Sequence, residues 1–275
     1  MSLSLELSPK SKIELEQRRQ QALVAAEKCM QLLKDDFGAT EVILCGSLAG
    51  ESPWHWHSDI DLAVKGMSKD AVWDAYSAIE DIVPHGLKVD IVPLEFAPNY
   101  VVNRILKKIP MPENKYLALK SRIEDELKSI EDTISTIHKV FEQMEGVSDI
   151  IVAPALASYI ADFYTGCERI SERVAVYLDG GLPTSQDWHQ QLLKQLAEPG
   201  GDNRPPLWRG ALLLELDEYR KFRHLERHIY KLELKPDRVI TLAENVEPVF
   251  NKIKSTVAIF SQWLEQQAEK QKEHN

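Results

Sequence analysis

The sequence predicts two parts of different fold class, a small α/β core followed by an all-α bundle. In the first part, short apolar runs rich in β-branched residues alternate with helical segments, which is the pattern of a sheet covered by helices. In the second part, apolar residues recur at three- and four-residue steps, as in bundle helices. Prolines punctuate the stretch between the two patterns: Pro98, Pro110 and Pro112. We therefore expect one domain at 1–109 and another at 115–275.

The first part should fold in the order helix, strand, strand, helix, strand. Its first helix has apolar residues on one side and is followed by Gly38, a residue favoured just past a helix end. Ser68 has the side chain needed to cap the second helix. The expected helices are 10–36 and 69–82, and the expected strands are 41–45, 59–64 and 87–93. These elements would make a compact α/β core.

The second part should consist of helices alone. Its pattern is clearest where apolar side chains share one stripe: Leu156, Ile160, Phe163, Cys167, Ile170, Val174 and Tyr177. A Gly-Gly-Leu-Pro stretch then ends that helix. The expected helices are 115–145, 150–178, 186–197, 208–231 and 239–270. Together they predict an all-α bundle.

Charge is spread evenly, and neither part has a basic tail or an obvious face for nucleic acid. The formal net charge is −10, and residues 1–114 carry 12 basic and 17 acidic side chains against 21 and 26 in residues 115–275. Each part is therefore about −5. Strong non-specific binding of nucleic acid would need a local basic cluster against this background, so we expect no DNA partner.

The cysteines and the apolar runs indicate a cytoplasmic protein. Three scattered cysteines, Cys29, Cys45 and Cys167, form no zinc-binding spacing and fit reduced thiols. No unbroken apolar run approaches the roughly 20 residues that span a bilayer. The first residues lack the charged and apolar pattern of a signal peptide. We therefore expect no membrane partner.

Three carboxylates behind a Gly-Ser turn carry the chemistry of the first part. Gly46 and Ser47 follow the first strand, Asp59 and Asp61 lie at the second, and Asp90 lies in the third. Asp59 and Asp61 are two apart, so a strand directs both to one side, where Asp90 on a neighbouring strand can meet them. Converging carboxylates repel one another unless a cation intervenes, and Mg²⁺ shares such oxygen ligands with phosphates. Phosphoryl or nucleotidyl transfer is the reaction that this pattern suggests.

This pattern resembles the minimal nucleotidyltransferases, small relatives of polymerase β, over about residues 10–95. The resemblance implies that Gly46 and Ser47 hold the triphosphate of ATP and that Asp59 and Asp61 bind Mg²⁺. It implies that Asp90 completes the metal site or activates the attacking hydroxyl. The chain departs from the family in its loop, which has eleven residues before Asp59 instead of about ten, with Leu48-Ala49-Gly50 in place of the usual charged residues. His55 and His57 in that loop could bind a metal, but a polar loop flanked by tryptophans is the favoured interpretation.

A second motif lies in the helical part, where Arg223, His228 and Tyr230 form Arg-x4-His-x-Tyr. RNA carries its own nucleophile, the 2′-OH, so cleavage needs a proton carrier and a cation. His228 can carry protons near neutral pH, and Arg223 can hold a phosphate. Arginines and histidines here also form a basic stripe that would face RNA: Arg220, Arg223, His224, Arg227 and His228. The alternative is a solvated helix face paired with nearby acidic residues.

The motif resembles the ribonuclease motif of HEPN domains, helical toxins that are paired with minimal nucleotidyltransferases as antitoxins. The resemblance implies that the transferase adds AMP to Tyr230 and silences the nuclease. Arg223 and His228 are five residues apart, about 140° around a helix. In the family two subunits bring their motifs together, so we expect a homodimer or higher homo-oligomer through the helical part.

Two other functions remain open. Aminoglycoside-modifying enzymes share the layout of a transferase core followed by a helical domain that binds the acceptor, and an acidic chain suits a cationic drug. Such a small-molecule nucleotidyltransferase has no need of the Arg-x4-His-x-Tyr motif. A nucleotide-binding regulator without turnover is the third possibility.

Overall fold

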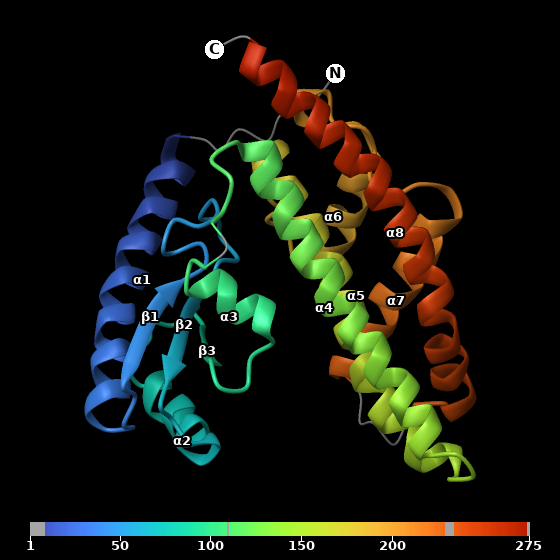
Figure 1. The fold of residues 1–275 in the computed structure, drawn as a ribbon, viewed down its shortest axis with the longest axis horizontal. Coiled ribbons are helices and arrows are strands. Elements are labelled where there is room, and N and C mark those ends of the chain that lie inside the picture. The colour runs from blue at the N-terminus through green and yellow to red at the C-terminus, as the bar shows by residue number, and fades with distance from the viewer. Residues whose placement is uncertain (1–8, 109, 229–233, 274–275) are drawn as a thin grey trace. The chain divides into compact units, whose positions relative to one another are not determined.

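The structure is a computed structural model that describes residues 9–108, 110–228 and 234–273. The chain divides into two compact units, one of Leu5–Met111 and the other built mainly on Pro112–Asn275. We call them the α/β unit and the helical unit (Figure 1). The predicted fold class, an α/β core followed by an all-α bundle, is confirmed.

The α/β unit is built on a three-stranded sheet with the order β1-β2-β3. β1 and β2 are antiparallel, whereas β2 and β3 are parallel. The elements in chain order are α1 Pro9–Asp35, β1 Glu41–Cys45, β2 Ile60–Lys65, α2 Lys69–Glu80, β3 Val89–Pro93 and α3 Asn99–Ile105. The strands begin or end within two residues of the predicted positions. Helix α3 was not expected from the sequence.

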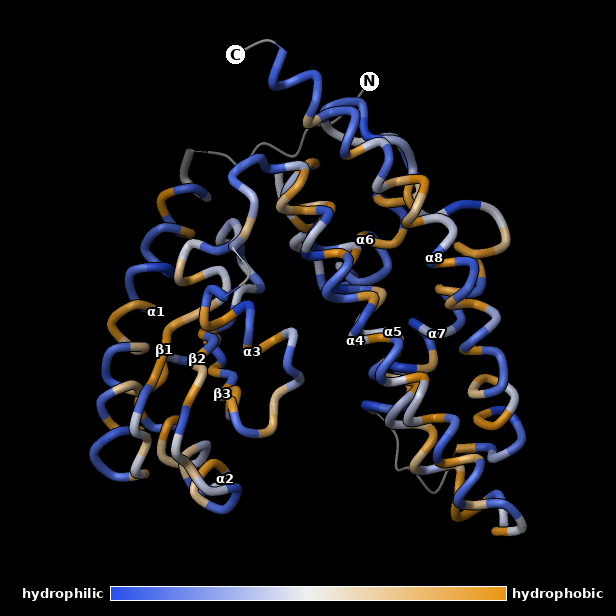
Figure 2. Tube along the Cα trace, viewed as in Figure 1, coloured by the Kyte–Doolittle hydropathy of each residue, from blue (hydrophilic) through white to orange (hydrophobic). Residues whose placement is uncertain are grey.

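One face of the sheet is buried by α1 and α2. Ile60, Leu62 and Val64 of β2 are fully buried and share a core cluster with Ala22, Cys29 and Leu33 of α1 and with Ala75 and Ile79 of α2. In Figure 2 the strands are largely hydrophobic, and α1 alternates hydrophobic and polar turns, as expected of a helix with one buried side. Since side chains alternate along a strand, Asp61 and Ala63 point to the opposite face.

Capping side chains fix where helices begin in both units. Ser68 accepts a hydrogen bond from the backbone N–H of Ala71 at the start of α2, as predicted. Asn114 accepts from the N–H groups of Tyr116 and Leu117 at the start of α4. Each contact satisfies donors that the first turn of a helix leaves unpaired.

The helical unit packs its helices around α5. Its elements are α4 Lys115–Gln143, α5 Asp149–Leu178, α6 Trp188–Ala197, the 3₁₀ turn η1 Gly201–Asn203, α7 Gly210–His228 and α8 Pro236–Glu273. The predicted 208–231 helix is described only as far as His228. α5 contacts α4, α6, α7 and α8. By length and composition α5 is apolar enough to cross a membrane, but most of its apolar residues are buried in this bundle, which accounts for its character.

Candidate functional site

The predicted carboxylates gather at one edge of the sheet. Because β1 runs against β2 and β3 runs with it, the end of β1 and the starts of β2 and β3 share that edge. The register pairs Cys45 with Asp61 and Asp61 with Asp90. Directly paired residues on neighbouring strands point to the same face, so Asp61 and Asp90 share the face that α1 and α2 leave uncovered. Asp59 immediately precedes β2.

The turn after β1 requires glycine at position 46 and is closed by hydrogen bonds with Glu51. Gly46 has φ +69°, in the left-handed region, and a Cβ there would overlap the carboxylate of Asp61. Its N–H donates to Oε2 of Glu51 at 3.1 Å, and the N–H of Glu51 donates to the carbonyl of Gly46 at 3.1 Å. The N–H of Gly50 donates to the carbonyl of Ser47 at 3.1 Å. The turn predicted to hold phosphates therefore closes around a carboxylate of its own loop.

The carboxyl group of Asp59 is partly buried and lies near a second negative charge. Burial raises the pKa of the Asp59 carboxyl, and the charge of Asp90 raises it further, while Lys88, Arg18 and His57 oppose the shift. Asp90 itself is exposed. A cation bound between Asp59 and Asp90 would reduce the electrostatic repulsion between their carboxylates.

Arg18 of α1 joins the two loops that carry these carboxylates. Its Nη2 donates to the carbonyl of Ser58 at 3.2 Å, and its Nη1 donates to the carbonyl of Gly86 at 2.9 Å. Ser58 directly precedes Asp59, and Gly86 lies four residues before Asp90. The guanidinium also lies 6.0 Å from the ring centroid of Trp54. No sequence signal marked Arg18, because its partners are 40 and 68 residues away.

The histidines of the loop serve its internal structure. The N–H of His57 donates to Nδ1 of His55 at 3.3 Å, and the N–H of His55 donates to Oγ of Ser58 at 3.0 Å. Burial and the nearby positive groups lower the pKa of His55 to about 4, so its imidazole is neutral at pH 7. The favoured interpretation, a polar loop, agrees with these contacts.

The carboxylate oxygens at this edge fit a hard divalent cation, but the described side chains are not already arranged around a metal position. In the described ranges, no three His, Cys, Asp or Glu side chains are arranged to hold a metal together. Asp59, Asp61 and Asp90 offer carboxylate oxygens at one sheet edge, the ligand type that Mg²⁺ prefers. The assignment of the metal to these three residues stays a prediction.

In the helical unit, Arg223 of α7 points into the bundle. Its Nη1 lies 3.1 Å from Oε2 of Glu168, and its Nε donates to Oγ1 of Thr165 at 3.0 Å. Only 8% of Arg223 is exposed. The predicted basic stripe is therefore wrong for Arg223, because a buried guanidinium needs a carboxylate partner and Glu168 of α5 provides it.

The rest of the stripe is partly paired on the surface. Nε of Arg220 donates to Oδ1 of Asp217 at 2.8 Å, and Nζ of Lys221 lies 2.6 Å from Oδ2 of the same carboxylate. His224 and Arg227 are exposed. His228 ends α7, and Tyr230 lies outside the described residues, so the geometry of the Arg-x4-His-x-Tyr motif beyond Arg223 stays a prediction.

Sequence reasoning missed the residues around Arg223. Oε1 of Glu168 lies 2.6 Å from Nδ1 of His189, which is on α6. Glu168 had a sequence signal, because it is an acidic residue within the apolar stripe of its helix. His189 had none, since it lies 21 residues away in a separate helix.

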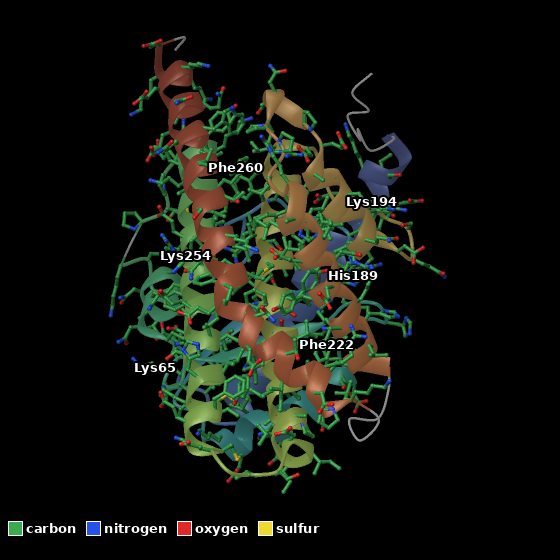
Figure 3. All side chains as sticks on the ribbon, turned by 90° about the vertical axis from the view of Figure 1, so that its right-hand side faces the viewer. Lys65, His189, Lys194, Phe222, Lys254 and Phe260 are labelled. Atoms are coloured by element: carbon green, nitrogen blue, oxygen red, sulfur yellow. The ribbon has the colours of Figure 1, made fainter. Side chains whose placement is uncertain are left out.

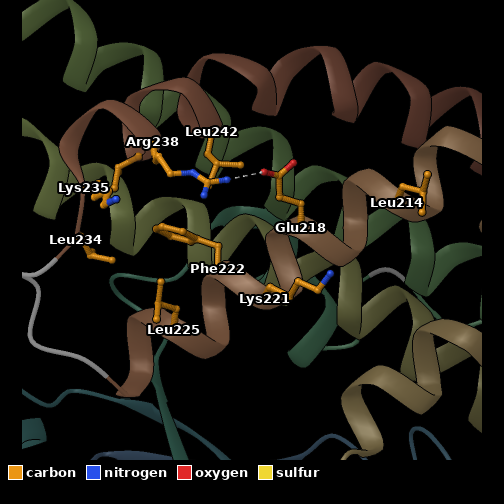
Figure 4. Close-up of a pocket in the computed structure, with 10 residues that line it drawn as sticks. Leu214, Glu218, Lys221, Phe222, Leu225, Leu234, Lys235, Arg238 and Leu242 are labelled. Carbon is orange, nitrogen blue, oxygen red and sulfur yellow. Dashed lines mark ion pairs between the residues drawn. The ribbon is translucent and has the colours of Figure 1, made fainter.

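A pocket of about 670 Å³ lies between α7 and the start of α8 (Figure 4). Phe222, Leu225 and Leu242 contribute apolar side chains, and Lys235 and Arg238 stand on the α8 side. Arg238 forms an exposed ion pair with Glu218 at 3.7 Å. The pocket shares α7 with Arg223, and its lining carries three basic side chains, Lys221, Lys235 and Arg238, against the single carboxylate of Glu218.

Comparison with known families matches each unit separately. Residues 27–116 match the family described as polymerase beta, nucleotidyltransferase, and residues 155–264 match the family described as HepT-like protein. No curated protein and no solved structure matched the chain. The chain thus joins a polymerase β-type nucleotidyltransferase domain to a HepT-like domain of the HEPN type, and this pair of matches fits the arrangement of a minimal nucleotidyltransferase–HEPN fusion.

Proposed function

We propose that this fusion is a self-contained toxin–antitoxin protein in which the α/β unit transfers AMP from ATP to Tyr230. The helical unit cleaves RNA when Tyr230 is unmodified. The observation that carries the proposal is the presence of both domains in one chain, together with the convergence of Gly46, Asp61 and Asp90 at one sheet edge. Nucleotidyltransferase domains use a nucleoside triphosphate and a divalent metal; ATP and Mg²⁺ are our proposal for this chain.

Transfer would begin with the turn after β1. The N–H of Gly46 would exchange the Glu51 carboxylate for a phosphate oxygen, and Ser47 would add its hydroxyl. Asp59, Asp61 and Asp90 would hold the cation, which when bound supplies Lewis-acid stabilisation of the phosphates. The phenol oxygen of Tyr230 would bond to the α-phosphorus as the bond to the β-phosphate oxygen breaks, releasing pyrophosphate. The phenol proton would pass to Asp90 or to solvent.

Cleavage of RNA would use Arg223 and His228 of the helical unit. Arg223 would stabilise negative charge on the phosphate, and His228 would move protons. Two copies of the chain would bring these groups together in a homodimer. The described cysteines, Cys29, Cys45 and Cys167, are free thiols, which supports our proposal of a cytoplasmic location.

The test is self-modification. Purified protein is incubated with ATP and Mg²⁺, and its intact mass is measured beside Tyr230→Phe and Asp59→Asn/Asp61→Asn variants. We expect the parent to gain one or more AMP units and both variants to gain none. A protein purified already modified would show a starting mass above that of the bare chain, and phosphodiesterase treatment would restore a substrate.

A parent that starts unmodified and gains no AMP would contradict the proposal. In that case the acceptor is a different molecule, and the small-molecule transferase becomes the better explanation. If ATP binds without turnover on any acceptor, the chain is a nucleotide-binding regulator.

A further inference from the structure

A buried carboxylate in the helical unit binds two basic side chains from two other helices. Glu168 of α5 has a side chain that is only 3% exposed. Its Oε1 lies 2.6 Å from Nδ1 of His189 on α6, and its Oε2 lies 3.1 Å from Nη1 of Arg223 on α7. A carboxylate withdrawn from water is costly unless its oxygens are paired, and here both oxygens have partners. The three helices therefore meet at one charged centre.

His189 is the member of this centre that reaches solvent. Its side chain is 31% exposed, against 10% for Arg223 and 3% for Glu168. Its ring is stacked on Trp188 with centroids 3.8 Å apart, which restrains its orientation. In Figure 3 His189 is labelled on α6, a helix that contacts both α5 and α7. The imidazole is thus held on one side and open on the other.

The carboxylate also decides which ring nitrogen can exchange protons. A carboxylate accepts hydrogen bonds, so Nδ1 of His189 donates to Glu168 and the neutral ring keeps its lone pair on Nε2. Among the described residues, this is the one side-chain hydrogen bond of His189. An imidazole oriented by a carboxylate, with its second nitrogen available, is the arrangement of a general base.

Arg223 is held in the same network and keeps donors for a ligand. Two of its N–H groups are used, by Glu168 and by Oγ1 of Thr165 at 3.0 Å. A guanidinium carries five N–H donors, so these contacts do not exhaust it. His228, by contrast, follows Arg223 on the same helix by five residues, about 140° away. Among the residues that the structure describes, His189 is the histidine that shares a carboxylate with Arg223.

We propose that His189 is an acid–base residue of the RNA-cleaving site and that Glu168 positions both His189 and Arg223. The proposal rests on the proposed function, since it names a further residue for RNA cleavage by the helical unit. The substrate class is an RNA phosphodiester with a free 2′-hydroxyl. Glu168 acts through its neighbours and touches no substrate.

The step balances without an added reactant. Nε2 of His189 takes the proton of the 2′-hydroxyl, and the 2′-oxygen bonds to phosphorus as the bond from phosphorus to the 5′-oxygen breaks. Arg223 stabilises the charge on the phosphate during this exchange. The proton returns from the imidazolium to the departing 5′-oxygen. The products are a 2′,3′-cyclic phosphate and a 5′-hydroxyl, and His189 ends neutral.

The experiment uses the full chain with Asp59→Asn/Asp61→Asn as the parent, so that Tyr230 stays unmodified, as checked by intact mass. His189→Gln is added because an amide can still donate to Glu168 but cannot exchange protons. Arg223→Ala tests the proposed nuclease motif itself. His138→Gln is the matched control, since His138 is 47% exposed and pairs with Glu247 at 3.4 Å, away from this network. Cleavage rate, its pH profile and the melting temperature are measured for each.

We expect His189→Gln to lower the cleavage rate by about 100-fold or more, the usual contribution of general acid–base catalysis, with little change in melting temperature. One limb of the pH profile should disappear in the same variant. His138→Gln should cleave like the parent. Glu168→Gln should shift the pH profile, which a purely structural role for Glu168 would leave in place.

The outcomes separate this inference from the function beneath it. If Arg223→Ala is inactive while His189→Gln cleaves like the parent, the role of His189 is overturned and RNA cleavage stands. If the parent itself does not cleave RNA, the proposed nuclease function fails and the role of His189 fails with it. If His189→Gln has a clearly lowered melting temperature, a folded His189→Gly variant is tested with free imidazole added. Rescue of RNA cleavage by imidazole would support the acid–base role of His189, and no rescue would refute it.

Discussion

At the end of β1, the Asp61 carboxylate lies so close to Gly46 that no side chain fits at that position. Gly46 adopts a positive φ, and the Asp61 carboxylate fills the space that a Cβ would need. Gly50, four residues later, also has a positive φ of +81°, but a Cβ there would meet nothing within 4 Å. The two glycines therefore separate backbone strain from displacement of the carboxylate.

Both Gly46→Ala and Gly50→Ala should lower the free energy of unfolding by about 1–2 kcal/mol, the cost of a left-handed alanine. Only Gly46→Ala should also abolish AMP transfer, because the added methyl displaces Asp61. Urea unfolding and the intact-mass assay measure the two effects. Equal transfer by both variants would show that the position of Asp61 does not matter.

Glu172 gives the helical unit a pH dependence. Partial burial, and then the charge of Glu168, raise the pKa of Glu172 to about 8 against an ordinary value of 4.5, while Arg169, Arg173 and Arg223 oppose the shift. Between those values the folded chain holds a proton at Glu172 that the unfolded chain has released, so stability falls as pH rises through this window. Below pH 4.5 both states are protonated and the contribution is fully present.

The wild type should therefore lose stability as the pH rises from about 4.5 to about 8, and Glu172→Gln should lack this loss. Denaturant midpoints at pH 5 and pH 8 for the variant and the wild type measure it. The stability of the variant relative to the wild type should be greater at pH 8 than at pH 5. A constant difference between the two proteins would contradict the raised pKa.

At the scale of elements, the packing of α5 against α4 leaves no room for a side chain at Gly166. Gly166 of α5 faces Ile130 of α4, and a Cβ at Gly166 would overlap Cγ1 of Ile130 and lie 3.0 Å from its Cδ1. Alanine at a helical position is otherwise favoured over glycine by about 1 kcal/mol. Packing and helix propensity thus oppose each other at this position.

Gly166→Ala should destabilise the helical unit by about 1–3 kcal/mol, since isoleucine has little rotamer freedom in a helix. In an Ile130→Ala background, where the overlap is gone, the same change should stabilise by about 1 kcal/mol. Chemical denaturation of the four proteins completes a double-mutant cycle. A change of the same sign in both backgrounds would remove Ile130 as the cause.

The sequence predicted the ends of helices and strands correctly where a contact between near neighbours sets them. Ser68 begins α2 as predicted, because an N-cap is a contact between near neighbours. The stretch punctuated by prolines, where we placed the domain boundary, contains α3, whose N-cap residue is Pro98. This seven-residue helix has no buried residue and so lacks the apolar stripe by which a sequence shows a helix.

At the scale of the whole molecule, the described residues form two hydrophobic cores that share no member. The buried cluster of the α/β unit includes Leu62 and Leu33, and that of the helical unit includes Phe163 and Trp208. The helical unit also contains a buried ion pair, in which Arg204 contacts both carboxylate oxygens of Asp179 at 2.8 Å. Each unit therefore has the interior that independent folding requires.

A fragment of residues 112–275 should fold alone, with helical circular dichroism and one cooperative melting transition. Its melting temperature should lie within a few degrees of a transition of the full chain. The variant Arg204→Ala, which leaves Asp179 buried without its main partner, should lower the stability of fragment and full chain alike, by about 3–5 kcal/mol. A fragment without cooperative melting would show that the helical unit depends on the rest of the chain.

The sequence by itself determined the fold class, the order of the elements and the gathering of Gly46, Asp61 and Asp90 at one sheet edge. Those features follow from the alternation of apolar residues, from turn residues and from capping, which act over a few positions. Only the tertiary structure decided that Arg223 turns inward to Glu168, that His189 joins it and that Arg18 ties two loops together. These contacts join residues 21 to 68 positions apart. Packing brings such partners together, and the cost of a buried charge then selects them.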